Sequence, residues 1–411
     1  MILTLIIIFI IVEYLLQLYL GIINERYSRN PIPNALRSIY NNWEYRRHSL
    51  YLQAKRRFGR WSSAVDTVIF IALLASGFLG WALSVCGLLC ESALLRDLVF
   101  LAAGTIAAQI YTLPFEYIGT FRIEERFGFN KCTLTTFIID AIKSTLISLL
   151  FTCALYGAIF QYYEMAGSNF WIAAWIFISA ISILLNATYA NTIIPLFNKL
   201  TPLQPGDLRT AIESFASQNN FALKGIYVID GSKRSTKANA FFCGFGRTKK
   251  IILYDTLINQ LTIDETVAVL AHEIGHYKHH DIIKNMASSV FTMGVYLFTL
   301  SLFVGNPELS SALGFNEPSL LLSLIAFSLL ITPINIILGP ITNSLSRRAE
   351  YRADTFAANA GLGKHLVSAL KKLTANSLSP LLVHPIYVTF SLSHPTLIQR
   401  IDNINNTNNS I

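Results

Sequence analysis

Seven apolar runs constrain the fold of this chain more than any other feature, because each is long enough to cross a bilayer. A helix needs about 20 apolar residues to span the hydrocarbon core of a membrane. The runs occupy residues 2–23, 66–89, 98–118, 142–163, 170–197, 286–304 and 319–340. Only 14% of the 411 residues are charged, against roughly 25% in ordinary soluble domains. We therefore predict a mainly α-helical membrane protein with seven transmembrane helices.

The basic residues predict how these helices are oriented. Of the 32 Lys and Arg residues, all but Arg96 lie in alternate loops: 24–65, 119–143, 199–285 and the segment after 340. Cytoplasmic loops carry an excess of Lys and Arg, so we expect the N-terminus outside and the C-terminus in the cytoplasm. We expect the first run to be a retained transmembrane helix and not a cleaved signal peptide, because no basic residue precedes it and no small-residue cleavage site follows it. Pro333 predicts a kink in the last run.

The charge and the cysteines argue against other classes of protein. A net charge of +8 can indicate a nucleic-acid partner, but here the basic residues follow the membrane topology, so we expect no nucleic acid. The five cysteines are scattered and form no CxxC pair. This spacing suggests neither a disulfide framework nor a cysteine-rich zinc site.

Residues 199–262 have the pattern of a small soluble α+β domain. Apolar residues recur at helical spacing in 206–220, and three short runs rich in β-branched and aromatic residues follow at 225–230, 238–244 and 249–255. Such runs predict strands, so we expect a sheet of about three strands with one open edge and a hairpin at 244–248. We divide the chain into an N-terminal transmembrane domain, 1–198, and a second domain, 199–411, which contains the last two spans at about 286–340.

A helix with metal-binding spacing follows the predicted sheet. Thr262 and Glu265 form a capping-box pattern that predicts a helix start. We expect the helix to run through residue 281, and it carries the sequence His272-Glu273-Ile274-Gly275-His276. Side chains four residues apart lie on one face of a helix, so both imidazoles can reach one metal ion while Glu273 accepts a proton from water. A catalytic zinc site of this kind needs a third protein ligand.

Glu350 is the candidate third ligand. It is followed four residues later by Asp354 on a segment with helical character. Asp354 could then hold a ligand histidine by its second ring nitrogen. Taken alone, Glu350 is better explained as a surface helix carboxylate paired with Arg347 or Arg348. The upstream motif reverses this preference and favours the ligand interpretation. His280 shares a face with the two histidines, but it lies a turn further on, and we favour a solvated or supporting role.

Five longer segments resemble the type I CAAX prenyl proteases, which are integral-membrane zinc metalloproteases. These segments are 114–143, 190–216, 229–257, 350–354 and 393–401. The resemblance implies seven helices that enclose a chamber, closed at its cytoplasmic end by a gluzincin domain with one zinc ion per chain. It also implies that Asn239 aligns the substrate backbone, that His394 stabilises the oxyanion, and that Arg400 supports the site.

The function implied by this resemblance is a membrane-embedded zinc metalloendopeptidase that processes C-terminal CAAX-type sequences. Its partners would be the lipid bilayer and a peptide or protein substrate that is isoprenylated or otherwise membrane-associated. Two alternatives stay open: a quality-control protease that clips misfolded or stalled membrane proteins, and a non-catalytic zinc protein that binds lipid or peptide. Tyr277 and the short polar tail depart from the eukaryotic pattern and suggest a bacterial plasma membrane, with the endoplasmic reticulum as the alternative.

Overall fold

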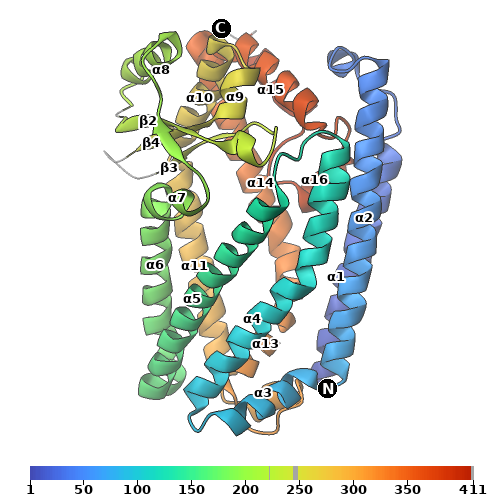
Figure 1. Cartoon of the computed structure of the whole chain (residues 1–411), viewed down its shortest axis with the longest axis vertical. Helices are drawn as coiled ribbons and strands as arrows, with labels where there is room; N and C mark the ends of the chain where they lie inside the picture. The colour runs from blue at the N-terminus through green and yellow to red at the C-terminus, as the bar shows by residue number, and fades with distance from the viewer. Residues whose placement is uncertain (222, 244–248, 409–411) are drawn as a thin grey trace.

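Long helices form most of the molecule, and a small sheet lies at one end of them (Figure 1). The computed structural model describes residues 1–411 except 222, 244–248 and 409–411. The N-terminus lies at the opposite end from the sheet, and the C-terminal helix lies at the same end as the sheet. The predicted hairpin at 244–248 lies outside the described residues.

The helices of the membrane region come from both halves of the chain. Most of them run along the long axis of the molecule, whereas residues 78–89 form a helix that lies across the end opposite the sheet (Figure 1). The principal ones are α1 (Ile2–Tyr27), α2 (Asn42–Ala75), α3 (Phe78–Leu89), α4 (Ala93–Tyr117), α5 (Leu134–Ala166), α6 (Phe170–Thr192), α11 (Asp281–Ser301), α13 (Leu320–Leu330) and α14 (Thr332–Ala357). Short helices α7 (Ile194–Phe197) and α12 (Pro307–Ser311) lie in connections.

Two of the seven predicted spans have a different form in the structure. The run 66–89, predicted as one helix, is divided at Gly77, which has φ 69° and separates α2 from α3. Helix α2 begins at Asn42 with a capping box, well inside the segment that we interpreted as a basic loop. The last run, 319–340, is broken between α13 and α14 by a bend of 54°. The kink predicted from Pro333 is thus confirmed, because Pro333 lies in the first turn of α14.

The number of membrane spans stays a prediction. By length and composition alone, the described residues contain four helical segments able to cross a membrane, or five if the bent pair forms one span. The longest segment, Leu134–Thr192, contains α5 and α6, which pack against each other. Helix α11 is not among these segments. No more than 11% of the residues in their apolar windows are buried, so most of these side chains face lipid or an interior space.

The sheet has four strands among the described residues, one more than predicted, in the order β1-β2-β4-β3. The strands are β1 (Leu200–Pro202), β2 (Gly225–Ile229), β3 (Ala240–Cys243) and β4 (Lys250–Tyr254). Strand β1 was missed because it is three residues long and ends in proline. The central pair β2 and β4 is parallel, whereas β3 is antiparallel to β4. Strand β3 therefore forms one edge of the sheet.

The soluble helices pack on this sheet and on one another around a single apolar cluster. They are α8 (Asp207–Gln218), α9 (Asp255–Gln260), α10 (Ile263–Lys278), α15 (Gly363–Ser377) and α17 (Leu397–Asn408), whereas α16 (Pro385–Ser391) packs on α1 and α14. Buried residues of α8, β4, α10, α15 and α17 share the cluster, including Ile212, Leu253, Leu270 and Leu366. Helix α10 is thus fixed from several sides, which makes it a rigid support for its polar side chains.

Candidate active site

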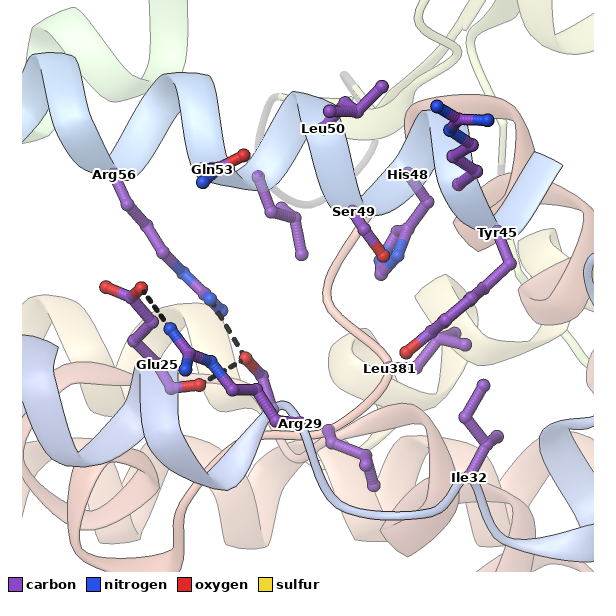
Figure 2. Close-up of a pocket in the computed structure, with 14 residues that line it drawn as sticks. Glu25, Arg29, Ile32, Tyr45, His48, Ser49, Leu50, Gln53, Arg56 and Leu381 are labelled. Carbon is purple, nitrogen blue, oxygen red and sulfur yellow. Dashed lines mark hydrogen bonds and ion pairs between the residues drawn. The ribbon is translucent and has the colours of Figure 1, made fainter. Parts of the chain in front are cut away.

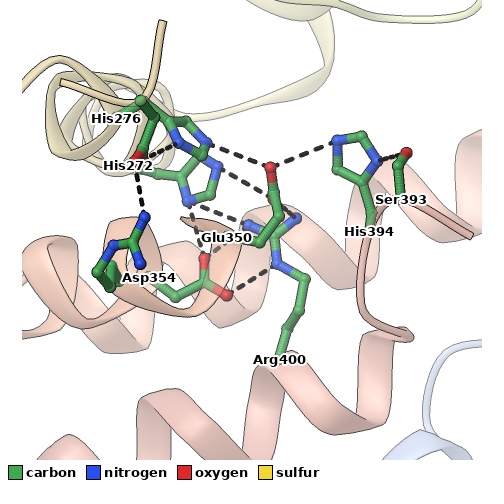
Figure 3. A network of polar contacts seen from close by, with 9 residues as sticks. His272, His276, Glu350, Asp354, Ser393, His394 and Arg400 are labelled. Carbon is green, nitrogen blue, oxygen red and sulfur yellow. Dashed lines mark hydrogen bonds and ion pairs between the residues drawn. The ribbon is translucent and has the colours of Figure 1, made fainter. Parts of the chain in front are cut away.

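Helices α10 and α14 bring His272, His276 and Glu350 together at one point (Figure 3). The candidate ligand atoms of these residues lie within 4.8 Å of one another. Nε2 of His272 lies 3.5 Å from Oε2 of Glu350, and Nε2 of His276 lies 3.2 Å from Oε1. The predicted capping box of α10 is confirmed, because the Thr262 hydroxyl accepts from the Glu265 amide while the Glu265 carboxylate accepts from the Thr262 amide.

The close approach of the two helices depends on Gly275. A Cβ atom at this position would lie 2.8 Å from the Ala353 Cα and 3.1 Å from the Ala353 carbonyl oxygen. Ordinary carbon–carbon contacts are about 3.5–4.0 Å. A glycine in the middle of the motif therefore lets α10 lie against α14, and this contact sets the distance between the histidines and Glu350.

The side chains of this group fit a metal ion. Oε2 of Glu350 is buried and has no hydrogen-bond partner among the described residues. A buried polar atom of this kind costs free energy unless a ligand or an ion satisfies it. Two imidazole nitrogens and one carboxylate form a common zinc set that keeps a further position for water or substrate.

Asp354 and Arg400 lie on the Nδ1 side of His272, away from the ring nitrogen that faces Glu350. Nδ1 of His272 lies 2.9 Å from Oδ1 of Asp354. Arg400 donates to both oxygens of the same carboxylate, at 2.9 Å and 2.6 Å. An Nδ1–H donated to a carboxylate leaves Nε2 unprotonated, as a metal ligand must be. The structure therefore places Asp354 where the sequence predicts it, and it places Arg400 on that carboxylate.

Asp281 holds His276 in the same way, and the sequence reasoning missed it. Nδ1 of His276 lies 3.0 Å from Oδ2 of Asp281, whose other oxygen accepts from Arg352 at 2.7 Å. The helix that we expected to continue through 281 ends at Lys278, and His280 adopts φ 57°. This break turns Asp281 back toward His276. The sequence does place an acidic residue five positions after His276. The side chain of that residue reaches His276 only because the helix breaks after Lys278, and the sequence did not predict this break.

The charge around the site favours a bound cation. Burial acts to lower the pKa of His276, but the carboxylates of Glu350 and Asp281 overcome this effect and raise the pKa to about 9. Burial raises the pKa of Glu273, and the nearby histidines act against that rise. A metal ion would compete with the proton on His276 and would stabilise the charged form of Glu273.

The other predicted residues differ in how close they lie to this group. Nε2 of His394 lies 3.4 Å from Oε1 of Glu350, and the His394 side chain is 66% exposed. Asn239 is exposed immediately before β3, and its backbone carbonyl accepts from the Tyr254 amide. No contact joins Asn239 to the histidines among the described residues. His280 is exposed and lies beyond the end of α10, away from the ligand positions that we predict.

A cavity of about 730 Å³ leads to the His394 side of the site. Its lining is mixed, with basic groups from three parts of the chain and apolar groups from the segment before α17. The lining includes Lys55, Arg56, Lys237, Tyr387, Leu392, His394 and Arg400. A substrate in this cavity would therefore meet positive charge beside the candidate ligands.

Apolar spans, a His-Glu-x-x-His helix and a carboxylate on a second helix together define a membrane metallopeptidase. Two family models match the chain: "CAAX prenyl protease N-terminal, five membrane helices" over residues 22–199 and "Peptidase family M48" over residues 202–408. The N-terminal match accounts for the first helices, and the second contains every candidate site residue. The family implies a metal cofactor, and the His272, His276 and Glu350 group is compatible with one.

Curated relatives match along most of their length. The rice CAAX prenyl protease 1 homolog is 35% identical over 402 residues, covering 96% of this chain and 95% of the relative. The human homolog is 31% identical and covers 90% and 88%. The crystal structure of S. mikatae Ste24p has a TM-score of 0.94 at 28% identity and covers 98% of this chain and 99% of that one. The chain therefore belongs to the type I CAAX prenyl protease family and is an integral-membrane metalloprotease.

Proposed function

We propose that this protein is a zinc metalloendopeptidase that cleaves peptide bonds in C-terminal CAAX-type sequences of prenylated or membrane-associated proteins. The observation that carries the proposal is the group of His272, His276 and Glu350 beside Glu273, at the end of a cavity in a membrane protein. The family membership and the names of the relatives support the CAAX-type substrate.

Four side chains would carry out the hydrolysis of the peptide bond: three would bind the metal ion and one would transfer the proton. We assign His272, His276 and Glu350 as ligands of one zinc ion, which would polarise the scissile carbonyl and lower the pKa of water. Glu273 accepts a proton from the attacking water and delivers it to the leaving amine. Its partly buried position, which raises its pKa, suits a group that must both take up and release a proton.

Two further groups act on the developing charge. Nε2 of His394 faces Glu350 at 3.4 Å from an exposed position, so it can donate to an oxyanion at the same place. Arg400 binds Asp354 with two hydrogen bonds and thereby orients His272, and its Nη1 lies 3.7 Å from Oε2 of Glu350. This role differs from direct oxyanion stabilisation and follows from its geometry.

We propose that the substrate backbone pairs with the edge of the sheet. Strand β3 pairs with β4 only, among the described residues, so its other side can accept an extended peptide. Asn239 lies exposed at the beginning of this edge and is the proposed anchor for the peptide backbone.

The orientation and the membrane are also proposals. The distribution of basic residues supports an N-terminus outside and a cytoplasmic C-terminus, which would place the site on the cytoplasmic side. We propose the bacterial plasma membrane, with the endoplasmic reticulum as the alternative. The partners are the bilayer and a peptide or protein substrate, and we propose no nucleic-acid partner.

The decisive experiment compares a farnesylated CAAX peptide with its unprenylated twin, using purified protein with and without a zinc chelator. We expect chelator-sensitive cleavage, and we expect Glu273→Gln to keep zinc while losing activity by at least about 10²-fold. Activity that survives in Glu273→Gln would refute the assigned mechanism. Cleavage of unprenylated membrane clients alone would refute CAAX specificity in favour of quality control, and zinc binding without any cleavage would favour a non-catalytic role.

A further inference from the structure

A second cavity, of about 430 Å³, lies outside the proposed catalytic group (Figure 2). The end of α1 and the segment after it form one wall, the first turns of α2 form another, and Leu381 and Leu382 close it. None of the proposed metal ligands or catalytic residues lines it. It touches the active-site cavity, however, because Leu52 and Arg56 line both.

The charged lining of this cavity has an excess of positive charge. Arg29, Arg46 and Arg56 line it, against the single carboxylate of Glu25. That carboxylate is already paired with Arg29 at 3.1 Å and also with Arg60. Arg46 forms no hydrogen bond or ion pair with any described residue. The cavity therefore offers cationic groups that its own acidic residue does not neutralise.

Arg56 points into the cavity with part of its hydrogen-bonding capacity unused (Figure 2). Its Nη1 donates to the hydroxyl of Ser28 at 2.9 Å, whereas its Nη2 is buried and has no partner among the described residues. The Ser28 hydroxyl in turn donates to the Glu25 backbone carbonyl. The Arg56 side chain is half-buried, but its Nη2 is a buried donor without a partner, which costs free energy. A bound anion would accept from it.

His48 supplies a second, independent unsatisfied group. The residue is only 5% exposed and lines the cavity. Its Nε2 lies 3.0 Å from the Ser379 carbonyl oxygen. Because a carbonyl oxygen only accepts, Nε2 carries the proton. Nδ1 is then a buried acceptor, and it has no partner among the described residues. A ligand that carries a hydroxyl group can donate to it.

We propose that this cavity binds a phosphate group that carries a hydroxylated substituent, as in the headgroup of an anionic phospholipid such as phosphatidylglycerol. The phosphate would accept from Arg56 and Arg46, and the headgroup hydroxyl would donate to His48 Nδ1. Arg56 follows His48 by eight residues, so their Cα atoms are about 12 Å apart along α2, a span that an arginine side chain and a headgroup can bridge.

The position of the cavity favours a lipid over a free phosphate. Helix α1, which is apolar along most of its length, ends at Tyr27 beside the cavity. Basic pockets between helices at the cytoplasmic surface are typical sites for anionic headgroups. Ile32, Leu50 and Leu381 add an apolar part to the lining, which suits the glycerol and the first acyl carbons.

Lipid binding can be measured by native mass spectrometry on the delipidated full-length protein in neutral detergent. We expect one dioleoylphosphatidylglycerol to bind at least about tenfold more tightly than dioleoylphosphatidylcholine. Arg56→Gln and Arg46→Gln should each weaken that binding about tenfold, whereas Arg56→Lys should lose less. Arg57→Gln is the matched control, because Arg57 is the next residue on α2 and lines a different hollow with Phe58 and Trp61.

Each outcome decides the proposal. Equal losses in Arg56→Gln and Arg57→Gln, or no preference for the anionic lipid, would overturn it, since binding would then depend on general surface charge. If millimolar inorganic phosphate displaced the lipid completely, the proposal that the ligand is a lipid headgroup would be wrong, and the cavity would be a site for free phosphate. Arg46 is exposed and unpaired, so Arg46→Gln keeps the test valid if Arg56→Gln fails to fold. The readout is lipid binding, so the result is independent of proteolytic activity.

Discussion

Replacing Gly275 by alanine tests whether the contact between α10 and α14 positions the metal ligands. The added Cβ would lie 2.8 Å from the Ala353 Cα and 3.1 Å from the Phe356 Cβ. The first contact falls about 0.7–1.2 Å short of an ordinary carbon–carbon distance. Because the nearest atom is backbone, it cannot rotate away, and the helices must separate by a comparable amount.

Two opposing contributions determine how Gly275→Ala changes the free energy of unfolding. Alanine is favoured over glycine within a helix by roughly 0.5–1 kcal/mol. Overpacking a well-filled interior costs typically about 1–3 kcal/mol, so we expect net destabilisation by about 1–2 kcal/mol. We expect the loss of zinc affinity to be more marked than the loss of stability, because metal–ligand distances tolerate deviations of only about ±0.2 Å. A separation of more than about half an ångström moves Glu350 out of range of the histidines, and we expect zinc affinity to fall at least about tenfold.

Zinc titration with a competing chelator, thermal unfolding in detergent and peptide cleavage together separate these effects. Gly157→Ala is the matched control, because Gly157 also lies in a helix, α5, and has no atom within 4 Å of its added Cβ. We expect this control to keep zinc affinity and to unfold at the same or a higher temperature. If Gly275→Ala bound zinc as tightly as the wild-type protein, the argument that this glycine sets the ligand distances would be wrong.

Three further predictions follow from the same geometry. Asp281→Asn should lower zinc affinity about 10–100-fold, because His276 loses the charged acceptor that fixes its tautomer; unchanged chelator competition would contradict this. His394→Gln should keep full zinc content but reduce kcat about 10²–10³-fold, measured at saturating peptide. Burial acts to raise the pKa of Glu265, but hydrogen bonds led by that from Lys372 lower it to about 2. Its unfolded pKa is about 4.3, so its contribution to stability is present above that pH and is lost as the pH falls toward 2. Glu265→Gln should therefore flatten the acid side of the unfolding curve, and an unaltered curve would disprove the pairing.

Local patterns predicted much of the candidate site because helical spacing is a local property. His272 and His276 share a helix face by their separation alone, and the capping box that starts this helix depends on residues three positions apart. The prediction that Asp354 supports a histidine followed from the same spacing on α14. Each of these inferences needed only one helix and its register.

Local sequence patterns could not predict the features that depend on tertiary contacts. The division of 66–89 depends on Gly77, where the chain turns with positive φ and lies against Gly314; an added Cβ at Gly314 would be 2.8 Å from the Gly77 Cα. Strand β1 exists because Leu200 and its neighbours pair with β2, not because three residues predict a strand. The role of Asp281 likewise depends on the break after Lys278.

Each of the two histidines that we assign as ligands is bonded to a carboxylate, and that carboxylate is paired with an arginine. His272 is bonded to Asp354, which is neutralised by Arg400, and His276 is bonded to Asp281, which is neutralised by Arg352. Each carboxylate fixes the tautomer of a histidine, and each arginine removes the net charge that the carboxylate would otherwise add.

The negative charges nearest the candidate ligand atoms are then those of Glu350 and Glu273, with Arg400 Nη1 at 3.7 Å from Oε2 of Glu350. These two carboxylates together match a divalent cation, which explains how a buried site can hold both when the ion is bound. Protonation of Glu273 during the reaction would leave a net positive charge beside the scissile carbonyl, and that charge favours an oxyanion. We therefore expect the two arginines to affect the reaction through the carboxylates that they bind. By neutralising Asp354 and Asp281, they would leave Glu273 as the group whose protonation changes the charge of the site.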